Sequence, residues 1–428
     1  MRAFYSCVFY LLIPFVLLRL IWRSFKAPAY RDRWRERLGF YSKKFPQGVI
    51  WFHAVSVGEA EALFPLVRQI QKQHPDEKLL ITTTTPTGSA RVKAAMQETL
   101  AHVYLPYDIP CAVKRFMLCF KPKLAVIMET EIWPNLFAYC GENDIPLYII
   151  NARLSEKSSR GYQKIPALIS PALAQASLIA TQTQADANRF IAIGAESEKV
   201  KTVGNIKFDI EIPQTLIEQG LQLRAGLFNA RFVWLIASTH KDEEVIFLRI
   251  YKAIKQEIPE LLLVIVPRHP ERFADVKKLC EQQLLNVVMR TAGEGINTQT
   301  DVYLADTMGE LKMLYAASDT AFVGGSMVPA GGHNILEAAA IGAPVMFGPY
   351  MANFKEIAAA ALNQHVAIQC QNEEEIVNKI LELYKQPAYR EALAKTGKAF
   401  VAQNQGAIAR ICEILTQTII KSKNPSTT

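Results

Sequence analysis

Short apolar runs alternate with amphipathic stretches along most of this chain. A polar stretch at 208–230 interrupts the alternation and divides the chain into two halves. Apolar runs separated by helical patterns are typical of parallel sheets covered by helices on both faces, so the pattern predicts an α/β protein with two Rossmann-like domains. The predicted strands are 49–55, 79–84, 103–107, 124–128, 147–151, 178–181 and 200–203 in the first half, and 232–238, 261–266, 287–290, 302–304, 320–323, 344–347 and 366–369 in the second.

The N-terminal segment from Phe4 to Leu18 is almost wholly apolar, and it extends to Trp22 if Arg19 reaches the lipid–water interface. A helix needs about 20 apolar residues to span a bilayer, and about 17 are tolerated, so this segment is borderline. No small-residue cleavage site of a signal peptide follows it. We expect residues 1–22 to form a membrane anchor, and a helix packed on the rest of the protein is the alternative. The domains are then expected at 23–207 and 231–428, with a linker at 208–230.

The basic residues are concentrated at the N-terminus. Lys and Arg number 48 and Asp and Glu number 40, a net charge of +8. Residues 1–45 hold ten of these basic residues and two of the acidic ones, so the rest of the chain sums to zero. A nucleic-acid-binding protein would carry its basic excess over a folded domain, so we expect no nucleic acid partner. The excess indicates that residues 23–44 contact anionic lipid, and it places the domains on the cytoplasmic side of the membrane.

Several common classes of site lack support in this sequence. The seven cysteines show no Cys-x-x-Cys spacing, which argues against a disulfide framework or a zinc site. Neither half has Gly-x-Gly-x-x-Gly after its first strand, and no P-loop motif occurs, so dinucleotide dehydrogenases and P-loop kinases lose their usual signature. Ligands of open α/β sheets bind beyond the carboxyl ends of the strands. The candidate residues are therefore those directly after the predicted strands.

Two acidic motifs follow strands of the first half. Glu59 lies in the segment His53–Glu59, at the start of the helix after the first strand. A carboxylate there is either a favourable charge at a helix N-terminus or a general base. Glu129 and Glu131 directly follow the strand at 124–128 and, two residues apart in extended chain, would share a face. Solvated loop acids are the alternative for this pair.

Two loops of the second half also follow strands. Arg268 and His269 leave a buried strand into a loop bracketed by prolines. A guanidinium in that position suits a phosphate, and a loop with solvated charges is the alternative. Gly309 lies in Thr307–Glu310, after the strand at 302–304. It either lets the backbone approach a ligand or makes a turn.

The segment Gly331–Glu337, preceded by Gly324-Gly-Ser, is the strongest motif. A glycine pair at the start of a helix frees backbone N–H groups to meet a phosphate. Asn334 and Glu337 are three residues apart and would share a helix face, where Glu337 could accept hydrogen bonds from ribose hydroxyls. His333 and Glu337 are four apart, as in half of a metal site. Because no second His or Cys cluster accompanies them, we expect no metal.

Together these motifs resemble those of the bacterial Kdo transferases, the 3-deoxy-D-manno-octulosonic acid transferases of lipid A and lipopolysaccharide synthesis. This family has a GT-B glycosyltransferase fold, in which two Rossmann-like domains face a cleft. Its membrane-associated N-terminal domain receives the acceptor, and its C-terminal domain binds CMP-Kdo. The resemblance runs from the apolar N-terminus to about residue 400 and rests on His53–Glu59, Glu129–Pro134, Asn151–Leu154, Gly204–Lys207, Pro267–Pro270, Met308–Glu310 and Gly331–Glu337.

The resemblance implies an inverting transfer of Kdo from CMP-Kdo to the lipid A precursor lipid IVA at the inner membrane. Glu59 would be the general base, and Glu131 and Lys207 would stabilise the charge of the transition state. The implied partners are CMP-Kdo, the lipid A precursor and inner-membrane lipid, and no cofactor is implied. The residues implied to hold the donor are Arg268, His269, Met308, Gly309, Glu310, Gly331, Gly332, Asn334, Ile335, Leu336 and Glu337.

Two other functions remain open from the sequence. A nucleotide-sugar 2-epimerase would share the Gly-Gly and Glu arrangement of the second half, although such enzymes lack an apolar N-terminus. A membrane-anchored binding protein without catalysis would need no carboxylate at position 59.

Overall fold

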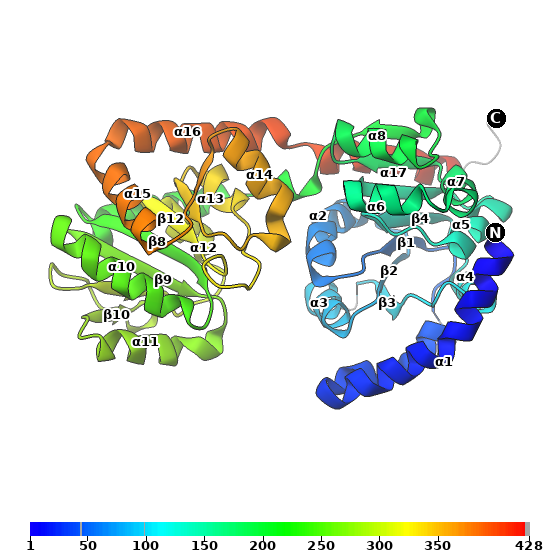
Figure 1. Ribbon diagram of the computed structural model, residues 1–428, viewed down its shortest axis with the longest axis horizontal. Helices are drawn as coiled ribbons and strands as arrows, with labels where there is room; N and C mark the ends of the chain where they lie inside the picture. Colours follow the sequence, from blue (N-terminus) through cyan, green and yellow to red (C-terminus); the bar gives the residue numbers. More distant parts are fainter. Residues whose placement is uncertain (43–44, 98, 424–428) are drawn as a thin grey trace. The chain divides into compact units, whose positions relative to one another are not determined.

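The computed structural model describes residues 1–42, 45–97 and 99–423, which divide into two compact units (Figure 1). The first unit combines the chain from Met1 to Asp209 with the C-terminal segment that begins at Gly406. The second unit is Ile210–Gln405. Each unit contains a parallel sheet of seven strands, which confirms the two α/β domains that the alternating pattern predicts.

The first unit is built on the sheet order β3-β2-β1-β4-β5-β6-β7. Its strands are β1 Ile50–His53, β2 Leu79–Thr83, β3 Ala101–Tyr104, β4 Leu124–Met128, β5 Leu147–Ala152, β6 Leu178–Thr181 and β7 Val200–Thr202. Its helices include α2 Val57–Gln73, α3 Pro86–Met96, α4 Pro110–Phe120, α5 Pro134–Glu142, α6 Glu156–Tyr162, α7 Pro166–Ala174 and α8 Gln184–Ala192. Successive side chains of a strand point to opposite faces, so β1 contributes Ile50 and Phe52 to one core and Trp51 to the other.

The second unit is built on the sheet order β10-β11-β9-β8-β12-β13-β14. Its strands are β8 Phe232–Thr239, β9 Leu261–Pro267, β10 Val287–Met289, β11 Val302–Leu304, β12 Thr320–Val323, β13 Val345–Phe347 and β14 Ala367–Gln369. Its helices include α9 Gln214–Leu223, α10 Glu243–Glu257, α11 Phe273–Gln282, α12 Leu311–Ala316, α13 Leu336–Ile341, α14 Lys355–Asn363, α15 Glu373–Lys385 and α16 Pro387–Asn404. Each predicted strand has a counterpart in these two sheets.

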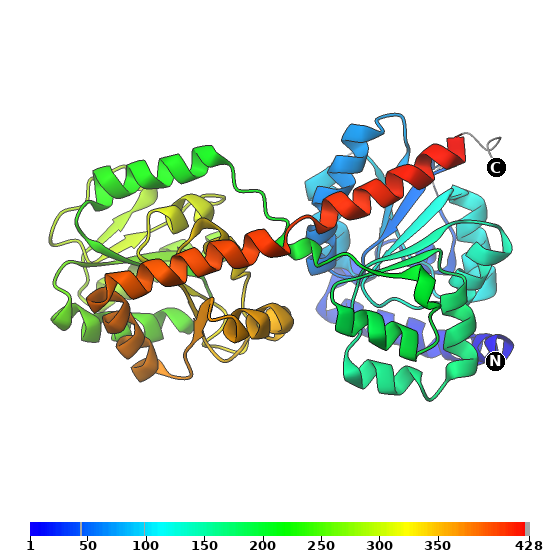
Figure 2. The ribbon, with the colours of Figure 1, turned by 90° about the horizontal axis from the view of Figure 1, so that it is seen from above.

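Two predicted boundaries differ from the structure. The expected linker at 208–230 is mostly helical, because α9 and a π-helical segment at Arg224–Phe228 occupy it within the second unit. The expected second domain at 231–428 ends earlier, because α17 (Ala407–Lys423) belongs to the first unit (Figure 2). Ile411 and Leu415 of α17 are buried in the same core as β1 and α2. An amphipathic helix can cover any apolar surface, so its own pattern does not reveal which unit it joins.

The N-terminal helix α1 (Arg2–Lys26) is long and apolar enough to cross a membrane, yet it is tied to the first unit near its beginning. The Arg2 guanidinium pairs with Glu142 at 2.7 Å, and the Ser6 hydroxyl bonds the Asn135 side chain at 3.0 Å. The hydroxyl oxygen of Tyr10 accepts a hydrogen bond from the backbone N–H of Cys111, in α4, at 3.4 Å. Large apolar side chains of α1 remain exposed, namely Phe4, Leu11, Leu12, Phe15, Leu18, Ile21, Trp22 and Phe25.

The basic segment after α1 also packs on other parts of the first unit. Arg33 and Arg37 lie over the Tyr104 ring, at 4.5 and 4.3 Å from its centroid. Arg37 is buried and donates to the carbonyl oxygen of Thr84 at 2.8 Å. The expectation that the whole segment 23–44 contacts lipid therefore needs correction, since Arg37 cannot reach a membrane surface. Lys43 and Lys44, which the same expectation included, lie outside the described residues.

Candidate active site

Three carboxylates gather where β1 and β4 end in the first unit. Glu59 lies in the first turn of α2 after β1, and Glu129 and Glu131 follow β4. Because β1 and β4 are parallel neighbours, their carboxyl ends meet at one edge of the sheet. Lys207 comes from the loop after β7 and reaches the same edge. The structure therefore brings together the three residues that were expected to act in catalysis, Glu59, Glu131 and Lys207.

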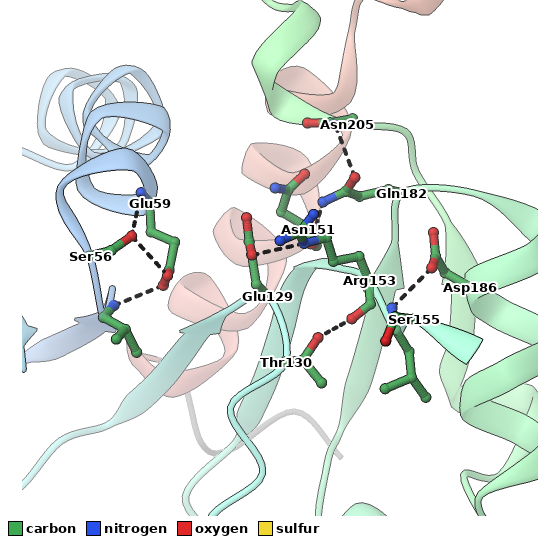
Figure 3. Close-up of polar contacts among 12 residues, drawn as sticks. Ser56, Glu59, Glu129, Thr130, Asn151, Arg153, Ser155, Gln182, Asp186 and Asn205 are labelled. Carbon is green, nitrogen blue, oxygen red and sulfur yellow. Dashed lines mark hydrogen bonds and ion pairs between the residues drawn. The ribbon is translucent and has the colours of Figure 1, made fainter. Parts of the chain in front are cut away.

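The Glu59 side chain is held in a capping box (Figure 3). Ser56 is the N-cap of α2, and its hydroxyl accepts from the Glu59 N–H at 3.3 Å and donates to the carboxylate at 3.0 Å. The N–H of Val55 donates to the other carboxylate oxygen at 2.8 Å. Glu59 therefore does lie at a helix N-terminus, as in the alternative to a general base that the sequence left open. It does not exclude a base, because each carboxylate oxygen has a second lone pair.

The electrostatics of this edge favour proton exchange. Burial raises the pKa of Glu59, and the charge of Glu129 raises it further, against lowering by the Val55 N–H, Ser56 and Lys207. Burial raises the pKa of Glu131 to about 7, and the charge of Glu59 adds to that shift. Neighbouring carboxylates oppose each other's ionisation. A base whose pKa is raised toward neutral pH is better suited to take a proton from a hydroxyl.

Glu129 has a different environment, because two cations face it. Arg153 Nε lies 3.0 Å from one carboxylate oxygen, and Lys207 Nζ lies 3.8 Å from the other. Glu129 has a φ of 56°, a left-handed conformation that is uncommon outside glycine. Such a conformation costs of order 1–3 kcal/mol and persists where the surroundings hold it. Glu129 thus holds Lys207 and Arg153 at the edge where Glu59 lies.

A network of amides fixes the loop that carries Lys207. Asn151, buried at the end of β5 with a φ of 49°, accepts from the N–H of Ile206 at 3.1 Å. Gln182 donates to the carbonyl oxygen of Asn151 at 3.0 Å and accepts from the side chain of Asn205 at 2.9 Å (Figure 3). These bonds connect the carboxyl ends of β5, β6 and β7. They set the position of Lys207, which the sequence indicated only through its family resemblance.

In the second unit, Arg268 and His269 are exposed directly after β9. Two further histidines lie beside them. His240, after β8, and His333, before α13, approach with their Nε2 atoms 2.8 Å apart and their rings stacked. The rings of His240 and His269 meet edge to face, with centroids 5.8 Å apart. The expected cationic loop is therefore part of a larger cluster.

The glycine motifs do not act as the sequence suggested. The N–H groups of Gly325, Ser326 and Met327 all donate to the buried carboxylate of Glu243, at 2.7 to 3.1 Å. The N–H of Gly332 donates to the carbonyl oxygen of Gly325. These backbone groups are therefore occupied within the protein and not open to a phosphate. The helix α13 begins at Leu336, several residues after the glycine pair.

The glycine pair is explained by close packing. A Cβ on Gly331 would lie 2.5 Å from the side-chain nitrogen of Asn353, and one on Gly332 would overlap the sulfur of Met351. Both glycines have positive φ, at 95° and 71°. The pair thus lets the loop before α13 pack against the segment Tyr350–Asn353. Ile335 and Leu336, also expected at the donor site, are buried in the fold.

The remaining donor residues lie around α12 and α13. Glu310 forms a bidentate ion pair with Arg290, at 3.0 and 3.2 Å. The hydrogen bonds from Arg290 lower the pKa of Glu310. Met308 is 58% exposed, and a Cβ on Gly309 would meet open space. Next to them is a hollow of about 470 Å³, lined by Gln219, Gln222, Leu223, Leu227, Arg290, Glu310 and Met313.

Asn334 and Glu337 have separate surroundings. The Asn334 side chain accepts from the N–H of Leu336 at 3.0 Å, in a tight turn just before α13. Glu337 lies 3.9 Å from Lys312 Nζ, and burial raises the pKa of Glu337 against the lowering effect of Lys312 and Arg268. A partly buried carboxylate near two cations can accept hydrogen bonds from a diol.

Sequence reasoning missed several residues of these sites. His240 lies two residues after the predicted strand 232–238, so the rule that ligands bind at strand ends could have found it. Arg290 is the last residue of the predicted strand 287–290 and could have been found in the same way. Arg153 lies in the matched segment Asn151–Leu154 but was not singled out. Glu243 and Lys312 carried no signal, since an acid or a lysine on a helix is ordinarily solvated.

Comparisons with known proteins identify the family of this chain. Residues 32–210 match the family model described as 3-Deoxy-D-manno-octulosonic-acid transferase (kdotransferase), and residues 244–400 match Glycosyl transferases group 1. The 3-deoxy-D-manno-octulosonic acid transferase of Haemophilus influenzae is 40% identical over 418 residues, which cover 97% of this chain and 98% of the relative. That of Bordetella pertussis is 34% identical and covers 86% of both chains.

Solved structures give the fold. The UDP-GlcNAc 2-epimerase from Neisseria meningitidis superposes on 88% of this chain and 100% of its own, with a TM-score of 0.54 and 16% identity. At that identity, the likeness shows the two-domain GT-B type of fold and nothing of the activity. The near full-length relative from Haemophilus influenzae decides between the families. This chain belongs to the 3-deoxy-D-manno-octulosonic acid transferases, the Kdo transferase family of glycosyltransferases.

Proposed function

We propose that this Kdo transferase moves Kdo from CMP-Kdo to the lipid A precursor lipid IVA, with inversion at the anomeric carbon. The observation that carries the proposal is the edge of the first unit where Glu59 and Glu131 have raised pKa values beside Lys207. We assign the acceptor to this first unit and the CMP-Kdo donor to the second.

Glu59 acts as the general base in this proposal. A sugar hydroxyl is a poor nucleophile, so a carboxylate must accept its proton as the new bond forms. The capping box holds the Glu59 carboxylate in one orientation, which removes the entropic cost of positioning it during the reaction. One base and one leaving group make a single displacement, and a single displacement inverts the anomeric centre.

Glu131 and Lys207 stabilise the charges that develop. The anomeric carbon of Kdo becomes oxocarbenium-like and gains positive charge as CMP departs. The negative charge of the Glu131 carboxylate stabilises that positive charge. Lys207 offsets the negative charge carried by the donor. Glu129 faces Lys207 and keeps it at this edge, so Glu129 is a residue that positions Lys207.

The second unit holds CMP through charge and hydrogen bonding. Arg268 and His269 pair with the phosphate, whose negative charge increases as the sugar leaves. Glu337 accepts hydrogen bonds from the ribose hydroxyls. Met308, Gly309 and Glu310 lie along the nucleoside, where Arg290 fixes the Glu310 carboxylate. Because the donor has one phosphate, these side chains can compensate its charge without a metal.

We further propose that α1 lies in the plane of the inner-membrane surface and does not cross the bilayer. Arg2, Ser6 and Tyr10 attach the first three turns of α1 to the first unit. If α1 crossed the bilayer, its N-terminal end would lie about 30 Å away on the far side, where none of these contacts is available. An amphipathic helix in the interface plane instead buries its exposed apolar side chains and keeps its basic residues at the lipid headgroups.

Product analysis tests the function directly. Purified full-length protein is incubated with CMP-Kdo and a tetraacylated lipid A precursor, and the lipid is examined by mass spectrometry. We expect a lipid heavier by one or more Kdo residues, with stoichiometric release of CMP. Release of CMP without modified lipid would contradict the acceptor. Turnover of UDP-GlcNAc without an acceptor would favour an epimerase.

A further inference from the structure

The contact between His240 and His333 restricts how many protons the two rings can carry. Their Nε2 atoms lie 2.8 Å apart, which is the distance of an N–H···N hydrogen bond. One Nε2 must therefore carry hydrogen and the other must offer its lone pair. Two imidazolium rings would each present a hydrogen at Nε2 and would repel. While the contact lasts, the pair has a net charge of either zero or +1.

The surroundings keep the pair neutral when no anion is bound. Burial lowers the pKa of His333 to about 4, and His240, Arg268 and His269 add to that shift. Burial also lowers the pKa of His240, with contributions from His269 and Arg268. The groups that face the pair from the loop after β9 are thus the permanently charged Arg268 guanidinium and the His269 imidazole.

The acid that accepts from the His240 backbone does not compensate the charge of the pair. Glu243, at the start of α10, accepts from the N–H of His240 and from three backbone N–H groups of the 324–327 turn. Its charge is directed at those backbone groups. The backbone of this turn passes close to both rings, since a Cβ on Gly325 would lie 3.1 Å from His240 and 3.2 Å from His333. The pair therefore lies next to the Arg268 guanidinium, whose charge a bound anion would compensate.

We propose that the His240–His333 pair takes up one proton from solvent when the donor phosphate binds at Arg268 and His269, so that an imidazolium joins the phosphate site. The inference rests on the proposed donor site and goes beyond it, since neither His240 nor His333 is among the expected donor residues. An anion within about 4–6 Å favours the protonated form of a histidine. The proton returns to solvent when CMP leaves.

Calorimetry of donor binding tests the proposal. The probe is the methyl phosphodiester of CMP, whose phosphate carries one charge throughout, like that of the donor. Titrations in two buffers of different ionisation enthalpy give the number of protons exchanged. We expect net proton uptake by the full-length protein, and a Kd that rises by up to about tenfold per pH unit between about pH 5 and 7. This range lies above the pKa of about 4 of His333 in the free protein and below the pKa that one nearby anion would give it.

Substitutions at three histidines separate proton uptake from packing. His240→Gln and His333→Gln each leave one ring that can still take up a proton, so the decisive variant combines both. It keeps polar groups of similar reach, and it should bind the probe more weakly and without the proton uptake and pH dependence that the pair contributes. His365→Asn is the matched control, because His365 is exposed and has a φ of 53°, which asparagine tolerates. It should behave like the wild type.

The possible outcomes are distinct. Binding by the wild-type protein that is independent of buffer and of pH would overturn the histidine proposal and leave the donor site standing. So would a pH profile that persists unchanged in the variant with glutamine at both positions. Absence of any binding of CMP or its methyl ester would instead contradict the proposed function itself.

Discussion

Arg153 Nε lies 3.0 Å from a carboxylate oxygen of Glu129, and this contact sets Glu129 apart from the other two acids at the ends of β1 and β4. Together with Lys207 at 3.8 Å, it compensates the charge of Glu129. Burial raises the pKa values of Glu59 and Glu131. Three acids that look alike in the sequence thus have different surroundings, because Glu129 is the one that pairs with both cations.

Replacing Glu59 should remove the general base. Glu59→Gln is expected to lower kcat by roughly 10²–10⁴-fold, the usual contribution of a positioned base. Glutamine can still complete the capping box, so the melting temperature should change little. The matched control is Glu61→Gln on the same helix, where Glu61 is exposed and pairs with Arg91. Near-normal turnover of the Glu59 variant would refute the assignment.

The raised pKa of Glu131 should make the protein less stable as pH increases. An unfolded Glu ionises near pH 4.3, whereas burial raises the pKa of Glu131 in the folded protein to about 7. Between these values the folded state binds more protons, so its stability falls as pH rises. Glu131→Gln should therefore raise the free energy of unfolding by about 1–3 kcal/mol at pH 8 and have little effect near pH 4.5.

Urea denaturation at the two pH values measures this effect. Glu198→Gln serves as the control, because Glu198 is exposed and a surface change should be close to neutral at both. An equal effect of Glu131→Gln at both pH values would mean that lost packing, and not ionisation, explains it.

Replacing Glu337 should weaken nucleotide binding. Glu337→Ala removes a partly buried carboxylate and is expected to weaken CMP binding by about 1.5–3 kcal/mol, as is typical of hydrogen bonds to charged groups. Isothermal titration calorimetry measures the change. Glu374→Ala, at an exposed position of α15, should leave the affinity unaltered. An unchanged affinity in the Glu337 variant would remove this residue from the donor site.

Removal of divalent metal ions should leave the activity intact. The single phosphate of the donor can be compensated by Arg268 and His269, so the proposed reaction needs no metal. Prolonged treatment with EDTA, followed by an assay of CMP release, is the measurement. A loss of activity that magnesium or another divalent ion restores would require a metal in the mechanism.

If α1 lies in the plane of the membrane surface, its N-terminus should be on the cytoplasmic side of the membrane. A peptide tag added before Met1 should be cut by protease in inverted inner-membrane vesicles and be protected in sealed spheroplasts, because an in-plane helix keeps both ends on the cytoplasmic side. Cleavage in spheroplasts would show that the helix spans. High salt alone should not release the full-length protein, since burial of apolar side chains is not screened.

The acids of the first unit show how far local pattern reaches. Glu59 and Glu131 follow apolar runs, and parallel strands bring such positions to one edge, so they could be found without a structure. Arg153 and Lys207 could not be placed against Glu129 in that way, because their contacts depend on the register of β5 and β7 relative to β4. The histidine pair was missed for the same reason, since His240 and His333 lie far apart in the chain.

The sequence by itself determined the two α/β units, their strands and the family, because alternating burial and local motifs are properties of short segments. Only the tertiary structure decided that Glu243 fills the glycine turn, that α17 joins the first unit, and that Arg37 packs on Tyr104. Each of these is a contact between distant segments. A charged or amphipathic segment has the same sequence pattern whether it contacts solvent, lipid or another part of the chain. The packing of the whole chain determines which of these it contacts.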